Sequence, residues 1–85
     1  MSELDQIFGY QISAARSLLG MGQSELAEAA AISIPTLRRM EASDGPASGL
    51  RNNVMAVRRV LEAAGVVFIS ENGGGAGVRL AKPRG

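Results

Sequence analysis

The spacing of apolar residues changes once along this 85-residue chain, at Gly65, and the change limits the folds open to it. Before Gly65, apolar residues recur every three or four positions, which is typical of amphipathic helices. After it, residues 66–70 and 78–81 are rich in β-branched and aromatic side chains, which indicates strands. We therefore expect a mostly α domain that ends in a β-hairpin. Its helical unit, hairpin and tail are expected at residues 1–65, 66–81 and 82–85.

Four amphipathic segments stand out in the helical unit, for which we expect four to five helices. The segments span residues 4–19, 23–30, 34–41 and 52–64. Ser2 or Asp5 is expected to cap the first helix and Ser33 the third, while Gly65 stops the fourth. Gly9 weakens the helical signal in the first turns. The expected inward residues are Leu4, Phe8, Ile12, Ala15, Leu19, Leu26, Ala27, Ala30, Leu37, Met40, Val54, Val57, Leu61 and Ala64.

The chain contains neither cysteine nor histidine, which limits its chemistry. Without cysteine there are no disulfides, thiolate zinc sites or cysteine nucleophiles, and without histidine the usual general base and imidazole metal ligand are missing. Glu25 and Glu28 lie three positions apart on the second expected helix, but no nucleophile accompanies them. We therefore expect no enzymatic activity, no cofactor and no metal site.

The net charge of +1 is unevenly distributed. Residues 1–48 hold three cations and six anions, which gives −3, whereas residues 49–85 hold six cations and two anions, which gives +4. The second part therefore allows a face that binds polyanions. No apolar run approaches the roughly 18 residues that span a bilayer, and the N-terminus is acidic, unlike a signal peptide. We expect a cytoplasmic protein with no membrane segment.

Residues 23–41, QSELAEAAAISIPTLRRME, hold the most informative pattern. Two short helical segments flank a three-residue break. The first begins with a Q-x-x-L-A pattern, an aliphatic residue and Ser33 form the turn, and Leu37 lies four positions before Glu41. This string resembles the lambda repressor/Cro-type helix-turn-helix family, also called the xenobiotic-response-element type. The resemblance extends over roughly residues 7–64.

Two positions depart from the family pattern. Ala31 stands where the family usually has glycine, at a turn that requires a positive φ, which alanine adopts at a cost of about 1 kcal/mol. Gly22 stands where the family usually has a serine or threonine cap, although glycine is a tolerable N-cap. We expect the backbone to adopt a positive φ at Ala31.

The resemblance implies a sequence-specific DNA-binding transcriptional regulator that places helix 34–41 in the major groove. At 100° per residue, with Leu37 facing the core, Pro35 and Arg39 point outward. Arg39 can donate two parallel hydrogen bonds to guanine. The expected base contacts are Ser33, Ile34, Pro35, Arg38 and Arg39. The expected phosphate contacts are Gln23, Thr36, Ser43, Arg51 and Asn52.

Further expectations concern the internal ion pair and the assembly. By resemblance, Arg16 and Glu41 form a partly buried ion pair between the first and third helices. The chain can bury roughly 63% of its extended surface, which is a thin core, so we expect a homodimer. As a regulator, such a dimer is expected to bind a two-fold symmetric operator and to act as a repressor. The hairpin leaves unpaired edges that can join two copies, with the fourth helix as the alternative. The expected dimer residues are Val67, Phe68, Ile69, Val78 and Leu80.

An alternative hypothesis is a protein-interaction module that keeps the helix-turn-helix shape without binding DNA, such as an antitoxin-like protein or an antagonist of another regulator. The −3 balance of residues 1–48, the apolar Ile34 and Pro35, and the turn that lacks the family's glycine favour it. In this case Arg38 and Arg39 are solvated, as we expect for Arg58 and Arg59 on the fourth helix. A regulatory protein partner takes the place of double-stranded DNA.

Overall fold

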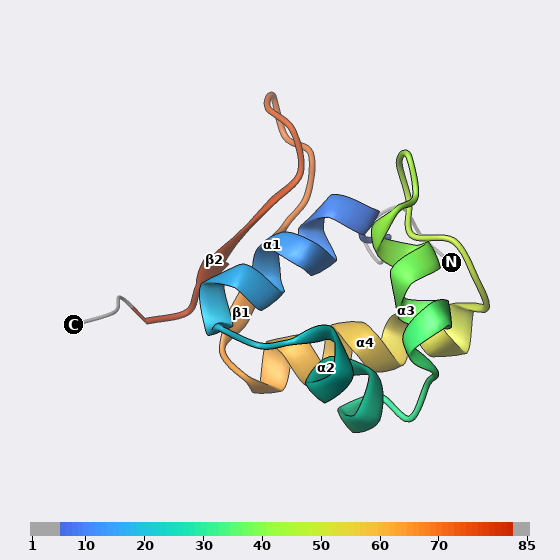
Figure 1. Cartoon of the computed structure of the whole chain (residues 1–85). Coiled ribbons are helices and arrows are strands. Elements are labelled where there is room, and N and C mark those ends of the chain that lie inside the picture. The colour runs from blue at the N-terminus through green and yellow to red at the C-terminus, as the bar shows by residue number, and fades with distance from the viewer. Residues whose placement is uncertain (1–5, 83–85) are drawn as a thin grey trace.

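Four helices and a two-stranded antiparallel hairpin make up the described residues, 6–82, of the computed structural model (Figure 1). The expected mostly α architecture with a C-terminal hairpin is confirmed. The elements are α1 (Gly9–Leu19), α2 (Gln23–Ala29), α3 (Ile34–Glu41), α4 (Arg51–Ala63), β1 (Val66–Ile69) and β2 (Gly77–Leu80). The expected inward residue Leu4 and the caps Ser2 and Asp5 lie outside the described residues, as does most of the expected tail.

The first helix begins at Gly9, later than the expected residue 4, because the chain just before it pairs with the loop that follows α3. Phe8 bridges Pro46 in antiparallel fashion, and the Ala47 amide donates to the Ile7 carbonyl at 2.9 Å. This pairing buries Ile7 to 1% exposure. Phe8 is the N-cap and is only half-buried, so it does not occupy the core position that the spacing suggested.

Gly9 is required by packing, although its residue type is unfavourable for a helix. A Cβ atom on Gly9 would lie 2.5 Å from the carbonyl oxygen of Met40 and 2.9 Å from that of Glu41. Its absence therefore lets the start of α1 approach the C-terminal end of α3.

The core lies between the four helices and the inner face of the hairpin. Its buried members are Ile7, Ile12, Ala15, Leu26, Ala27, Ala30, Leu37, Met40, Val54, Val57, Leu61 and Val66. The expected inward position Ala64 is wrong. That residue is the exposed C-cap of α4, because Gly65 turns the chain there with a φ of 107° and Val66 fills the core instead.

Arg58 also differs from expectation, since it is half-buried rather than solvated. Its guanidinium carbon lies 5.4 Å from the centroid of the Phe68 ring, and its Nε lies 3.3 Å from a Glu62 oxygen. A cation over an aromatic face covers apolar surface of the hairpin. Arg59, by contrast, is exposed as expected.

The hairpin is attached to the helices by its inner face and by two polar side chains of α1. β2 packs on α1 and β1 on α4. Buried Gln11 donates from Nε2 to the carbonyls of Ile69 at 3.3 Å and Gly77 at 2.9 Å, and the Tyr10 hydroxyl donates to the Ala76 carbonyl. The first turns of α1 therefore hold the base of the hairpin loop, which runs on past that helix in Figure 1.

Candidate nucleic-acid interface

The turn between α2 and α3 has the positive φ that the family resemblance implies at position 31, although alanine stands there in place of glycine. Ala31 has a φ of 57° and is the only non-glycine residue with a positive φ among residues 6–82. The amide of Ala31 donates to Glu28 at 3.1 Å and that of Ile32 to Ala27 at 3.0 Å, so hydrogen bonds hold the turn. The alanine side chain carries a cost of about 1–2 kcal/mol in this region, which these bonds must offset.

Ser33 begins α3 as the expected N-cap. Its hydroxyl oxygen accepts from the Thr36 amide at 3.2 Å and lies 2.8 Å from the Thr36 hydroxyl oxygen. Pro35 occupies the first turn, where no helical hydrogen bond needs its missing N–H. Cap and proline together define where α3 starts and therefore which of its residues face outward.

Leu37 and Met40 anchor α3, since both are fully buried against the core. The opposite side of the helix carries the exposed residues Pro35, Arg38 and Arg39. Ile34, an expected base contact, is partly buried and packs against the core. Its contribution to an outward surface is therefore smaller than its position in the helix suggested.

Arg39 has weak attachments within the protein. One terminal nitrogen lies 3.4 Å from the Thr36 hydroxyl oxygen, at the long limit of a hydrogen bond. The Ser43 hydroxyl donates to the Arg39 carbonyl at 3.0 Å and accepts from the Ser48 amide at 2.9 Å. Ser43 is thus occupied in ordering the loop after α3, while the guanidinium of Arg39 keeps most of its donors for a ligand.

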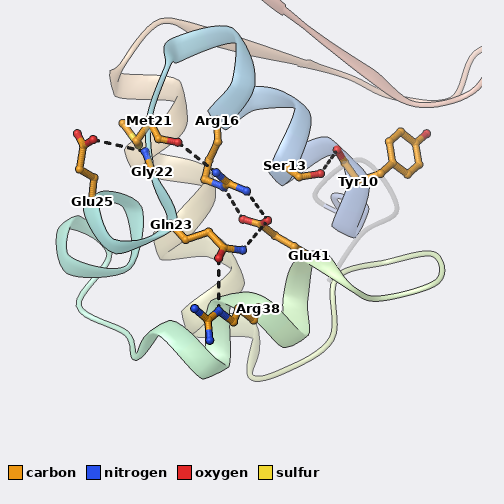
Figure 2. Close-up of polar contacts among 9 residues, drawn as sticks. All are labelled: Tyr10, Ser13, Arg16, Met21, Gly22, Gln23, Glu25, Arg38 and Glu41. Carbon is orange, nitrogen blue, oxygen red and sulfur yellow. Dashed lines mark hydrogen bonds and ion pairs between the residues drawn. The ribbon is translucent and has the colours of Figure 1, made fainter.

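A continuous polar network joins α1, α2 and α3 (Figure 2). We call it the Arg16 network; its members are Arg16, Glu41, Gln23 and Arg38. Arg16 and Glu41 make the expected ion pair in a two-pronged geometry, with nitrogen–oxygen distances of 2.7 and 2.8 Å. The Glu41 side chain is only 8% exposed. The pKa of Arg16 is raised above its ordinary value, chiefly by the hydrogen bond to Glu41 and also by its charge, while burial opposes the rise.

Gln23 connects this ion pair to the surface. Its Nε2 donates to Glu41 at 3.1 Å, and its Oε1 accepts from Arg38 Nε at 3.4 Å. Neither contact has a sequence signature, because Gln23 and Arg38 lie on different helices. The expectation that Gln23 holds a phosphate did not include these internal partners.

The remaining candidate residues are divided between the start of α4 and the hairpin. Arg51 and Asn52 are exposed at the start of α4. Phe68, Val78 and Leu80 of the expected dimer surface are partly buried against the protein's own core, because Val66, Phe68, Val78 and Leu80 share the inner face. Val67 and Ile69 lie on the other face, and Ile69 is 38% exposed.

Sequence analysis missed Gln11 and Tyr10, whose partners at the hairpin are backbone carbonyls more than fifty residues away.

Among residues 6–82, acidic side chains form no group of three that could hold a metal ion. No helix in the same range is both long and apolar enough to cross a bilayer. A comparison with protein-family models finds none that matches the chain, and a comparison with curated proteins likewise finds no match.

Proposed function

We propose that this protein is a transcriptional regulator that binds specific double-stranded DNA sequences through α3, in the manner of the lambda repressor/Cro-type helix-turn-helix family. The observation that carries the proposal is the division of α3 into two sides. Leu37 and Met40 are fully buried. Arg38 and Arg39 are exposed on the other side, one turn beyond the exposed Pro35. A helix so divided can enter a major groove with its cationic side forward.

The chemistry of this side suits base recognition. Arg39 has five N–H donors in a planar fork, which matches the O6 and N7 acceptors of guanine. Pro35 offers an apolar surface to a thymine methyl, and Ser33, whose hydroxyl caps α3 through Thr36, lies just before the helix. Because the contact of Arg39 with Thr36 is 3.4 Å long, little must be broken when the guanidinium turns to a base.

We further propose that the protein acts as a homodimer on a two-fold symmetric operator and represses transcription by covering a promoter. Two exposed arginines on a single α3 give a modest electrostatic contribution, so a second copy adds greatly to affinity. A two-stranded sheet leaves both outer edges unpaired, and exposed Ile69 lies on the outer face of the hairpin. These features support pairing through the hairpin, with α4 as the other candidate.

Substitution of Arg39 tests the proposal. On the DNA sequence that the protein selects from a random pool, Arg39→Ala should lose about 10- to 100-fold in discrimination at one base pair. Arg59→Ala is the matched control, because it removes one exposed arginine from α4. Affinity is measured by fluorescence anisotropy on the operator and its single-base variants. Unchanged selectivity in Arg39→Ala would contradict the assigned role.

A protein-interaction module on the same scaffold is the second candidate. Glu25 and Glu28 are exposed on α2, next to α3, and a DNA duplex would repel them. If the protein retains one stoichiometric protein partner from its source and binds no DNA at low salt, this second candidate replaces the first.

A further inference from the structure

We propose that Arg38 contacts the DNA phosphate backbone and that Gln23 is a positioning residue that aims it. This assignment rests on the proposed DNA-binding function. It changes two of the roles expected from the sequence, which gave Arg38 a base contact and Gln23 a phosphate contact. The Arg16 network provides the evidence (Figure 2).

The orientation of the Gln23 amide is determined by its inner partner. An ionised carboxylate only accepts hydrogen bonds, so the group that faces Glu41 at 3.1 Å must be the NH₂ end of the amide. The same Glu41 oxygen accepts from Arg16 Nη2 at 2.8 Å, and Arg16 Nη1 donates to the Met21 carbonyl at 3.2 Å. The bond to Glu41 fixes the NH₂ end of the amide and leaves its carbonyl oxygen facing Arg38.

An outward carbonyl oxygen suits a cation and not a phosphate. Gln23 Oε1 lies 3.4 Å from Arg38 Nε, and a phosphate at the same place would bring two acceptors together. Arg38 itself is exposed, and Figure 2 shows its other two nitrogens directed away from Gln23. The paired N–H groups on those nitrogens form the fork that binds phosphate oxygens.

The position of Arg38 on α3 favours a phosphate over a base. A helix with its side chains is about 10–12 Å across, and the major groove is about 12 Å wide, so side chains on the flanks of a bound helix meet the groove walls. Arg38 is on the flank next to α2, where its Nε lies 3.4 Å from Gln23 Oε1, at the long limit of a hydrogen bond. Pro35 and Arg39, by contrast, point most directly outward. The groove walls are lined by the sugar–phosphate backbone.

The salt dependence of binding distinguishes a phosphate contact from a base contact. The plot of log K against log salt has a negative slope. Loss of one phosphate contact makes this slope about 0.9 less steep and weakens binding equally on all sequences. The affinity ratio of unsubstituted protein to Arg38→Ala should therefore shrink about threefold between 50 and 200 mM salt. The ratio should be the same on the operator and on its single-base variants.

A double-mutant cycle tests the part played by Gln23. If Gln23 acts only through Arg38, Gln23→Ala weakens binding in the unsubstituted protein and has no further effect in Arg38→Ala. Thermal unfolding of each variant separates a binding effect from loss of the fold, and the exposed Arg38→Ala is expected to unfold as the unsubstituted protein does.

Two results would overturn the inference while leaving the DNA-binding proposal intact. One is a change of base preference at a single position in Arg38→Ala with an unchanged salt slope, which would identify a base contact. The other is an equal loss of affinity from Gln23→Ala with and without Arg38, which would identify an independent phosphate contact. If the unsubstituted protein binds no DNA at 50 mM salt, the inference and the proposed function both fail.

Discussion

The two polar attachments of the molecule, the Arg16 network under α3 and the contacts of Gln11 and Tyr10 with the hairpin, are built in different ways. In the network, side chains bind one another and the last one, Arg38, is exposed. At the hairpin, side chains bind backbone carbonyls, and buried Gln11 uses both ends of its amide within the protein. We propose that the first arrangement holds a cation toward DNA, whereas the second fixes the hairpin to α1.

These two attachments predict that substitutions at one should affect binding and substitutions at the other should affect only stability. Changes at the outer end of the Arg16 network should alter binding with little change in the free energy of unfolding. Changes at the hairpin attachment should loosen the sheet and leave α3 intact. Substitutions that reach both regions should have the largest effect.

Gly9→Ala should have the largest effect, because Gly9 lies at the junction of α1 with the end of α3. The added Cβ would meet the carbonyls of Met40 and Glu41 within 3.0 Å, so we expect a loss of about 3 kcal/mol or more in the free energy of unfolding. Urea unfolding followed by circular dichroism measures it. Gly74→Ala is the control, since a Cβ there meets nothing within 4 Å and should change stability little. Equal stability of the two variants would disprove the close approach.

Arg16→Met should rank second, with a loss of about 2–3 kcal/mol, because it leaves Glu41 without its ion-pair partner at 8% side-chain exposure. The folded-state pKa of Arg16 is raised, so its contribution to stability is complete below the ordinary arginine pKa and is lost only as pH rises through the raised value. The stability difference between variant and unsubstituted protein should therefore be constant from pH 6 to 9. A difference that vanishes by pH 9 would argue against this ion pair.

Gln11→Leu should cost about 1–3 kcal/mol, because it leaves the Phe8 amide and the carbonyls of Ile69 and Gly77 without this partner. Hydrogen exchange should report faster opening of β1 and β2, with α3 unaffected. Gln6→Leu, at an exposed glutamine before α1, serves as control. If α3 opens as readily as the hairpin in Gln11→Leu, the two regions are not separable as we describe.

Ala31→Gly should have the smallest effect and the opposite sign. At a φ of 57°, glycine avoids the steric cost of alanine, so we expect a gain of about 0.5–1 kcal/mol in the free energy of unfolding. Ala29→Gly, on the exposed face of α2, should instead lose about 1 kcal/mol. A loss of stability in Ala31→Gly would mean that the turn does not need the positive φ.

Much of the fold follows from local signals in the sequence. The N-cap Ser33 and the inward pair Leu37 and Met40 result from spacing and residue type within one short segment. The positive φ at Ala31 followed only from the family resemblance, because alanine itself disfavours that region. The boundaries of α1 did not follow, because its start is determined by pairing with a loop that is distant in sequence. Ala64 was misplaced because the helical spacing was continued from Val57 and Leu61 one residue past the end of α4, to its C-cap.

The candidate site was only partly predictable for a related reason. The ion pair of Arg16 with Glu41 was expected from a family resemblance, and the structure forms it. The contacts of Gln23 with Glu41 and Arg38 depend on how α2 and α3 pack, and no residue spacing within either helix reveals them. Side-chain roles that arise between elements require the tertiary structure.

Selection of bound fragments from random DNA is the sharpest test of whether α3 recognises a specific DNA sequence. We expect enrichment of one inverted repeat whose half-site centres are about one helical turn, roughly 34 Å, apart. In Arg39→Ala, the preference at one position of each half-site should be lost. Failure of the unsubstituted protein to enrich any sequence at low salt would contradict such recognition.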